Sequence, residues 1–237
     1  MRLGIMQPYF FPYIGYFSLI KHTDKFILFD SVQYIRHGWI ERNRILKQNE
    51  GWQYIQVPII KKNGRNTLIK DIEINNNENW QSKILAQLQH YKKKAPNYFK
   101  IVSLLNAIFA QKYEDIVTLN KISLEKTLQY LGIDKELKIF SKMNLQIEKV
   151  NAPDEWALNI CKSIEGADEY WNPPGGQKFF DKQKYDKSRI NLKFQNVCIT
   201  EYDQFRNTFE GGLSILDVMM FNSVDEINEM LDKFELI

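Results

Sequence analysis

Residues 2–45 of the 237-residue chain, RLGIMQPYFFPYIGYFSLIKHTDKFILFDSVQYIRHGWIERNRI, contain the pattern that indicates the fold class. Residues 3–6 and 26–29 are short apolar runs followed by turn signals, and residues 16–22 between them suit a helix. Two buried strands about twenty residues apart, with a helix between them, are typical of a parallel βαβ unit. The sequence therefore predicts an α/β fold that begins with a parallel βα core.

Polar side chains follow both predicted strands. Gln7 comes directly after the first strand, and Asp30 comes after the second. Open α/β sheets bind ligands at the carboxyl ends of their strands. We therefore expect Gln7 and Asp30 to face one crevice.

A cluster of hydrogen-bonding groups continues after Asp30 with Gln33, Arg36, His37, Trp39, Arg42 and Asn43. The planar guanidinium of Arg42, helped by Arg36, suits a phosphate or carboxylate. Trp39 offers a face for stacking, and Asp30 can accept from hydroxyl or amino groups. These features predict a ligand site. The alternative is that Arg42 and Asp30 form a solvated ion pair and that Trp39 belongs to the core.

The rest of the chain reads as a β-hairpin and a largely helical remainder. Apolar residues at 52–60 and 68–74 predict two hairpin strands around the basic turn 61–66. Helical periodicity and stop signals predict helices at 80–95, 98–109, 113–131, 154–164, 213–221 and 224–234. Short strands are predicted at 137–140, 190–194 and 197–200. We expect a single chain, 1–237, with an α/β core in 1–79 and a mainly helical part in 80–237.

Composition and charge exclude several classes of protein. Hydrophobic residues make up 44% and charged residues 26% of the chain, and the net charge of +3 gives no case for nucleic-acid binding. No apolar run reaches the roughly 18 residues of a membrane span, and Pro8 and Pro12 interrupt any signal-peptide core. Two cysteines fit a reducing compartment. We expect a cytoplasmic protein without membrane insertion.

Three histidines supply the candidates for acid–base catalysis. His90 follows a predicted apolar helix face, and an imidazole titrates near neutral pH, so His90 is the candidate general base. The alternative is a structural or merely exposed side chain. His22 and His37 are weaker candidates. The histidines are too scattered for a zinc motif, and neither cysteine has a partner at metal spacing, so no metal site is predicted.

The sequence NPPGGQ at 172–177 cannot form a regular element and predicts a loop. Asn172 and the backbone N–H groups of Gly175 and Gly176 could serve an anion or an oxyanion. The alternative is a tight connection between a helix and a strand. No G-x-G-x-x-G or Walker motif occurs, so a standard dinucleotide or P-loop site is unsupported.

Two further groups have structural interpretations. Asp217 lies three residues after Ser214, and Glu226 three residues after Ser223, which is the spacing of a capping box. Helix capping is therefore favoured over a site role for Asp217. Cys161 lies among apolar helix residues and is interpreted as a buried structural thiol rather than a nucleophile.

Several motifs resemble the WbqC-like family of bacterial proteins. They are MQPYFFPYIGYF at 6–17, DSVQY at 30–34, WIERNRI at 39–45, HYKKKAP at 90–96, YWN with GG at 170–176, YDQF at 202–205 and LSILDVMMFN at 213–222. Together they span nearly the whole chain. Trp171 departs from the pattern, which has a smaller residue there.

The resemblance implies a transferase of bacterial surface-polysaccharide (O-antigen, lipopolysaccharide) biosynthesis, which moves an aminoacyl or acyl group such as glycyl onto the amine of a nucleotide-linked amino sugar. His90 is then the candidate base, with Asp30 as the second choice. The candidate substrate-binding residues are Gln7, Gln33, Arg36, Trp39, Arg42, Asn43, Asn172, Gly175 and Gly176.

For such a transferase we expect no permanently bound cofactor. The acyl donor would be a carrier-protein thioester or an adenylate, and magnesium would be needed only if a nucleoside triphosphate is used. The expected partners are the nucleotide-linked amino sugar and, for a thioester donor, an acyl carrier protein. A homodimer is also compatible with the sequence.

A fainter resemblance links residues 7–16 to the HIGH-type nucleotidyltransferases. PYIGY at 12–16 stands where those enzymes have H-x-G-H, and both histidines are missing. This resemblance implies a Rossmann-like core and an alternative function as an adenylate-forming or nucleotidyltransferase-like enzyme. The third alternative is a non-catalytic protein that binds a nucleotide sugar or acts as a scaffold.

Overall fold

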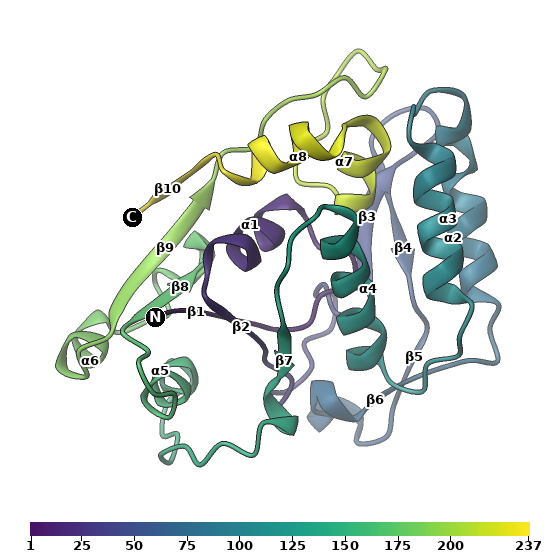
Figure 1. Ribbon diagram of the computed structural model, residues 1–237. Helices are drawn as coiled ribbons and strands as arrows, with labels where there is room; N and C mark the ends of the chain where they lie inside the picture. Colours follow the sequence, from purple (N-terminus) through teal and green to yellow (C-terminus); the bar gives the residue numbers. More distant parts are fainter.

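A six-stranded sheet crosses the computed structural model, which describes residues 1–237 (Figure 1). Its order is β10-β9-β8-β1-β2-β7. The strands are β1 (Arg2–Met6), β2 (Lys25–Leu28), β7 (Leu137–Ile139), β8 (Glu169–Asn172), β9 (Asn191–Val197) and β10 (Phe234–Leu236). All neighbours pair in parallel except β10, which runs antiparallel to β9 at the edge. The predicted α/β class, with a Rossmann-like parallel core, is confirmed.

The chain changes direction across the sheet after β7. It passes from β1 to β2 and then β7 on one side, and returns to the other side of β1 for β8 and β9. The strand order therefore reverses between β1 and β8. In open parallel sheets the crevice at such a switch point, outside the carboxyl ends of the strands, is where ligands bind.

Alternation along the strands gives the sheet two buried faces. Leu3 and Ile5 of β1 pack into a core with α5 (Glu155–Lys162) and α6 (Lys182–Lys187). Phe26 and Leu28 of β2 point to the opposite face and join a larger core. That core includes residues of α1 (Ile14–His22), α4 (Ile116–Tyr130), α7 (Ile215–Phe221) and α8 (Val224–Leu231). Burial on both faces explains why the β1 and β2 sequences are continuous apolar runs.

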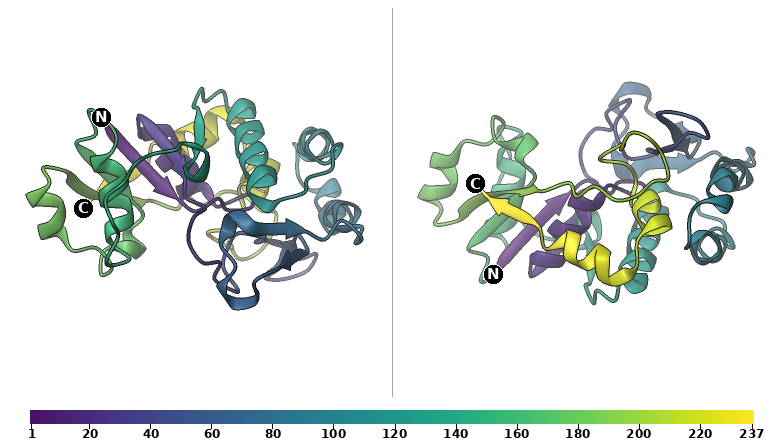
Figure 2. Two further views of the ribbon diagram at one scale, coloured as in Figure 1. Left: turned by 90° about the horizontal axis from the view of Figure 1, so that it is seen from below. Right: turned by 90° about the horizontal axis from the view of Figure 1, so that it is seen from above.

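Two small antiparallel pairs stand beside the main sheet. β3 (Arg42–Leu46) pairs with β4 (Trp52–Gln56), and β5 (Ile59–Lys61) pairs with β6 (Ile72–Ile74). Figure 2 shows them, together with α2 (Trp80–Leu88) and α3 (Tyr98–Phe109), lying to one side of the six-stranded sheet. The stretch 2–45 therefore begins in the main sheet with β1 and ends in β3, in the smaller β3–β4 pair.

The predicted hairpin of 52–60 with 68–74 forms only in part. Pro58 separates β4 from β5. β4 pairs with β3, which was not predicted as a strand because its sequence begins with polar and charged residues. The second half of the predicted pair does form, as β5 with β6. Residues 198–200 are not a strand. β10 forms the edge of the sheet beside β9, and only its first residue, Phe234, lay within a predicted helix.

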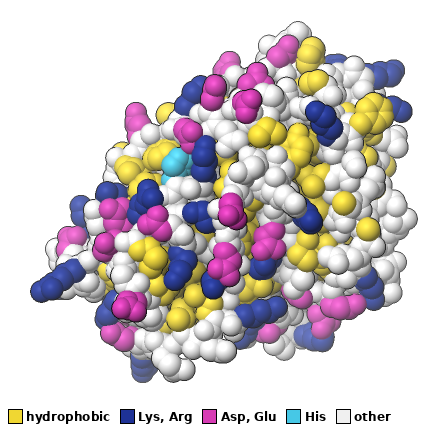
Figure 3. All heavy atoms as spheres, in the orientation of Figure 1, with side chains coloured by type: hydrophobic (Ala, Val, Ile, Leu, Met, Phe, Trp, Pro, Cys, Tyr) yellow, Lys and Arg dark blue, Asp and Glu magenta, His cyan; other side chains and the backbone are white.

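No helix is long and apolar enough to cross a bilayer. The face of the molecule in Figure 3 mixes Lys and Arg with Asp and Glu, as the small net charge leads one to expect. The helix predicted at 98–109 is confirmed as α3, and the strand predicted at 137–140 is confirmed as β7.

Candidate ligand-binding site

A pocket of about 390 Å³ opens where the strand order reverses. We call it the switch-point pocket. Its walls come from the end of β1, the loop after it, β3, the residue after β8, and the segment 198–214. The lining residues are Met6, Tyr9, Pro12, Tyr13, Trp39, Asn43, Arg44, Pro173, Ile199 and Gly212. The pocket thus lies at the position that the sheet topology favours for a ligand.

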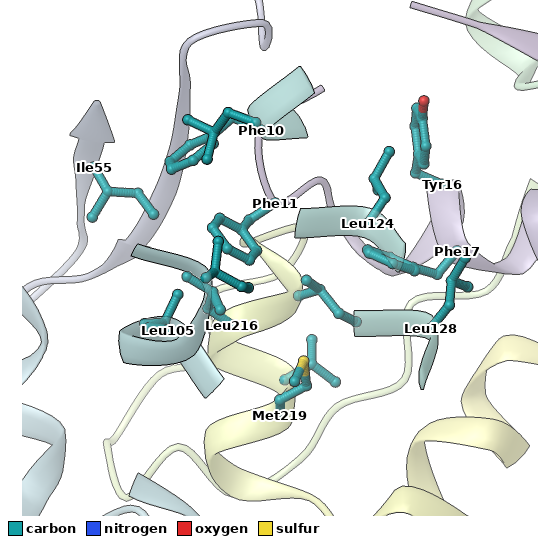
Figure 4. Packing of buried hydrophobic residues seen from close by; sticks show 14 of the residues in the cluster. Phe10, Phe11, Tyr16, Phe17, Ile55, Leu105, Leu124, Leu128, Leu216 and Met219 are labelled. Atoms are coloured by element: carbon teal, nitrogen blue, oxygen red, sulfur yellow. The ribbon is translucent and has the colours of Figure 1, made fainter. Parts of the chain in front are cut away.

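The loop between β1 and α1 is fixed by two buried aromatic anchors. Phe10 and Phe11 are at most 1% exposed and belong to the main core. The Phe11 ring points toward Leu105 and Leu216, and the Phe10 ring lies on the side of Ile55 (Figure 4). Phe11 has a φ of +39°, which is unfavourable for a residue with a side chain. Its burial holds it there, and the neighbouring Tyr9, Pro12 and Tyr13 are left to line the pocket.

Three buried polar side chains satisfy the carbonyl groups of this loop. Asn120 donates to the carbonyl of Pro8 at 2.8 Å, Asn43 to that of Phe10 at 3.0 Å, and Ser214 to that of Phe11 at 2.7 Å. Unpaired buried carbonyls would be costly. These bonds tie the loop to β3, α4 and the start of α7, so the shape of the pocket wall is set by four separate parts of the chain.

Two tyrosines give the pocket a neutral, aromatic wall. Burial raises the pKa of Tyr9 and of Tyr13, so both hydroxyls are protonated at neutral pH. The ring of Tyr13 folds over the first turn of α1, where a Cβ on Gly15 would lie 2.5 Å from it. Only glycine at position 15 therefore allows this ring position. Protonated hydroxyls can donate to a ligand and cannot act as bases near neutral pH.

Arg44 supplies the positive charge of the switch-point pocket. Its guanidinium carbon lies 5.5 Å from the ring centre of Trp39 and 5.2 Å from that of Trp52, and Nη2 donates to the carbonyl of Gly212 at 3.1 Å. Nε has no hydrogen-bond partner. No acidic side chain pairs with this guanidinium, so its charge is available to an anionic ligand.

The structure brings two of the predicted binding residues into this pocket, Trp39 and Asn43. Asn43 is 3% exposed. Its side-chain NH₂ donates to the Phe10 carbonyl and its side-chain oxygen accepts from the Arg44 N–H, so Asn43 supports the wall of the pocket. Gln7 follows β1 next to Met6, and its carbonyl accepts from the Tyr16 hydroxyl at 2.9 Å. The Gln7 side chain makes no hydrogen bond within the chain and is not among the lining residues.

The expectation that Gln7 and Asp30 face one crevice is corrected. The Asp30 carboxylate is 1% exposed and accepts from the hydroxyl of Ser141 at 2.5 Å and from its N–H at 3.0 Å. Ser141 follows β7, on the side of β2 away from the switch point. Asp30 therefore joins two strand ends and lines no part of the pocket.

The remaining residues of the predicted cluster lie elsewhere. Gln33 donates to the carbonyl of Arg65 at 2.6 Å. Arg42 donates to the carbonyls of His37 and Gly38 and covers the ring of Tyr54 at 4.2 Å, while Arg36 shares a separate surface pocket with it. Arg42 thus holds the turn before β3, and it forms no ion pair with Asp30.

His90 lines a third and larger cavity, of about 860 Å³, which we call the basic pocket. No residue lines both this and the switch-point pocket. Nδ1 lies 2.9 Å from the carbonyl of Gln87, an acceptor, so Nδ1 carries the proton and Nε2 is the basic nitrogen. Nε2 is enclosed without a partner, and burial lowers the His90 pKa. The structure does not bring His90 together with Arg42 or Asp30.

The predicted loop after β8 contains a short 3₁₀ turn, Pro174–Gly176. The Gly176 N–H donates to the carbonyl of Pro173 at 3.1 Å, so it is not free for an anion. Asn172 donates to the Tyr170 hydroxyl, and Pro173 reaches the switch-point pocket. This turn therefore contributes an apolar wall. The Gly175 N–H makes no bond within the chain and is the one backbone donor left from the predicted set.

Asp217 has a different environment from the helix cap that the sequence suggested. Ser214 does cap α7, but the Asp217 carboxylate is fully buried and accepts from Tyr91 at 2.5 Å, Tyr202 at 2.6 Å and Gln204 at 3.0 Å. Burial raises the pKa of Asp217 to about 6. The capping box of Ser223 with Glu226 is confirmed. Cys161 is buried, and its burial raises the pKa of the thiol to about 12, as for an inert structural cysteine.

Sequence reasoning missed Arg44, Tyr9 and Tyr13 as pocket residues. A signal existed for the tyrosines, because they flank Pro12 in a loop that follows a strand. The sequence does not distinguish Arg44 from Arg42, because only their tertiary contacts differ. Arg42 covers the ring of Tyr54, whereas Arg44 lies beside the rings of Trp39 and Trp52. No three His, Cys, Asp or Glu side chains converge as they would around a metal ion. The groups that line the switch-point pocket and could contact a ligand are aromatic rings, a carboxamide and a guanidinium.

Comparison with known proteins gives a family and one relative. The WbqC-like protein family matches residues 7–229. The uncharacterized protein Rv1507c of Mycobacterium tuberculosis is 29% identical over 223 residues, which are 93% of this chain and 93% of that protein. No solved structure matches the chain.

Proposed function

Because the chain belongs to the WbqC-like protein family, we propose that it is a transferase of bacterial surface-polysaccharide (O-antigen) assembly. It binds a nucleotide-linked amino sugar in the switch-point pocket and transfers an acyl or aminoacyl group, such as glycyl, to the sugar amine. The acyl donor is a carrier-protein thioester or an adenylate.

One observation carries the assignment of the ligand. The pocket at the switch point combines the Trp39 ring, two neutral tyrosines and the unpaired guanidinium of Arg44. Planar rings stack on aromatic side chains, and a guanidinium pairs with phosphate oxygens. A nucleotide-linked sugar carries both features in one molecule. A neutral metabolite would leave the charge of Arg44 unused.

The same walls favour the chemistry of the acceptor. Transfer requires the amine nitrogen to attack the acyl carbonyl carbon. The bond from that carbon to the thioester sulfur or the adenylate oxygen then breaks, and the proton that the nitrogen loses goes to the departing group or to solvent. An apolar pocket with a nearby cation disfavours the ammonium form and so raises the fraction of nucleophilic amine. The protonated hydroxyls of Tyr9 and Tyr13 can donate to the developing oxyanion.

A second candidate is a non-catalytic nucleotide-sugar binding or scaffold protein. The observation that favours it is the pocket lining, whose ten residues include no Asp, Glu, His or Lys. Under this alternative the protein binds the sugar nucleotide tightly and forms no product. An adenylate-forming enzyme would instead bind a nucleoside triphosphate with magnesium and release pyrophosphate.

Thermal shift and product formation separate these functions. We expect a nucleotide-linked amino sugar at millimolar concentration to raise the Tm by several degrees, because a ligand that binds the folded state stabilises it. Trp39→Ala should remove most of this shift. Trp156→Ala, which removes a partly buried indole on α5, is the control that should keep it.

Mass spectrometry of the sugar after incubation with an acyl donor completes the test. Acylated sugar supports the transferase, and a Tm shift without product supports the binding protein. A shift with ATP and magnesium but none with nucleotide sugars would contradict the proposal and favour adenylation.

A further inference from the structure

The basic pocket is a second site, and its cations have no acidic partners. Lys47, Lys92, Lys93, Lys94 and Arg206 all line it. None of them forms an ion pair, whereas eight lysines elsewhere in the chain do. Glu50 is the only acid in the lining. Exposed lysines are usually just solvated, but here five cations and one acid surround a single cavity of about 860 Å³.

The fold explains how these cations meet. Lys92 and Lys93 end the 3₁₀ segment after α2, Lys94 is the next residue, and Lys47 follows β3. Arg206 arrives from the segment before α7, where Nη1 donates to the carbonyl of Gly51 at 3.1 Å, and Lys94 donates to the carbonyl of Phe205 at 3.1 Å. These two bonds hold three distant segments of the chain around the cavity. A cavity bordered by one sign of charge concentrates the oppositely charged ligand.

The other lining groups indicate hydroxyls beside the anion. Gln48, Asn49 and Gln89 line the pocket, and their side-chain amides make no hydrogen bond within the chain. A carboxamide offers both a donor and an acceptor, which suits the hydroxyl groups of a sugar. Few apolar residues line the cavity, so neither a lipid nor an aromatic ligand matches it.

From these groups we infer that the basic pocket binds a sugar phosphate, with the lysines on the phosphate and the free carboxamides on the sugar hydroxyls. The inference does not depend on the proposed function, because it would hold if the switch-point pocket were empty of any ligand. Asp217 lies behind Tyr91 and Gln204, which line the pocket, and its three hydrogen bonds keep it away from the ligand.

Isothermal titration calorimetry with glucose 1-phosphate, inorganic phosphate and glucose tests the inference. We expect glucose 1-phosphate to bind at least 10-fold more tightly than inorganic phosphate, glucose not to bind measurably, and the affinity to fall as ionic strength rises. Lys47→Gln with Lys93→Gln should raise the Kd for glucose 1-phosphate at least 10-fold. The matched control, Lys100→Gln with Lys178→Gln, removes two lysines outside the pocket and should change it less than 2-fold.

Two further variants locate the binding. Gln48→Ala with Asn49→Ala should weaken glucose 1-phosphate and leave inorganic phosphate unchanged. Arg44→Ala, in the other pocket, should change neither. Equal affinities for glucose 1-phosphate and inorganic phosphate would overturn the sugar recognition. Unchanged binding in the Lys47 and Lys93 variant, or lost binding in the Arg44 variant, would overturn the placement.

Discussion

Asp217→Ala is expected to lower the free energy of unfolding by roughly 3 kcal/mol at pH 7.5. The Asp217 carboxylate accepts hydrogen bonds from Tyr91, Tyr202 and Gln204, and alanine would leave these buried donors unpaired. Each orphaned buried donor costs about 1–3 kcal/mol, and partial rearrangement recovers some of the sum. Urea unfolding followed by circular dichroism measures the change. Asp134→Ala, at an exposed and unpaired position, should stay within about 0.5 kcal/mol of wild type.

The same carboxylate predicts a pH dependence. Burial raises the pKa of Asp217 to about 6 from an ordinary value of 3.8, so the folded protein binds the proton more tightly than the unfolded chain. Stability from this group is therefore fully present below pH 3.8 and is lost as pH rises through 6. Wild type should gain about 1.4 kcal/mol relative to Asp217→Asn between pH 7.5 and pH 5, because one pKa unit corresponds to that energy. A stability difference that does not change with pH would contradict this environment for Asp217.

Arg44→Ala is expected to weaken binding of a nucleotide-linked amino sugar by roughly 10- to 150-fold. The guanidinium lies between Trp39 and Trp52 with no acidic partner, and a charge-assisted pair with phosphate contributes about 1.5–3 kcal/mol. Arg44→Lys keeps the charge but loses the planar fork, so it should fall between wild type and Arg44→Ala. Titration calorimetry gives the three dissociation constants.

Arg42→Ala is the matched control for Arg44, two residues away on the same strand. Arg42 donates to the carbonyls of His37 and Gly38 and lines a different pocket. Its loss should reduce stability while changing the affinity for the nucleotide sugar less than 3-fold. If Arg42→Ala weakened binding more than Arg44→Ala, the assignment of the phosphate to Arg44 would be wrong.

The central βα core could be predicted because burial leaves a local mark in sequence. β1 and β2 are covered on both faces, which requires continuous apolar runs, and α1 fits between them. β3 could not be recognised in the same way. It consists of Arg42, Asn43 and Arg44 followed by two apolar residues, and its strand conformation depends on pairing with β4.

The candidate site depended on relations that no local pattern contains. The switch point lies between β1 and β8 because the chain crosses back over the sheet after β7, so Pro173 rather than Asp30 comes to lie beside the β1 loop. The Asp30 carboxylate accepts hydrogen bonds from Ser141, 111 residues away in sequence. Residue types suggested which side chains can bind a ligand, and the tertiary hydrogen bonds determined which of them remain free to do so.

Ligand binding in the switch-point pocket can be observed in a crystal structure of the protein with a bound nucleotide-linked amino sugar. A planar ring of the ligand should stack within about 4 Å of Trp39. A phosphate oxygen should lie within about 3 Å of the Arg44 guanidinium. A nucleotide sugar bound only in the basic pocket, or beside Arg42, with the switch-point pocket empty, would contradict the proposed binding site.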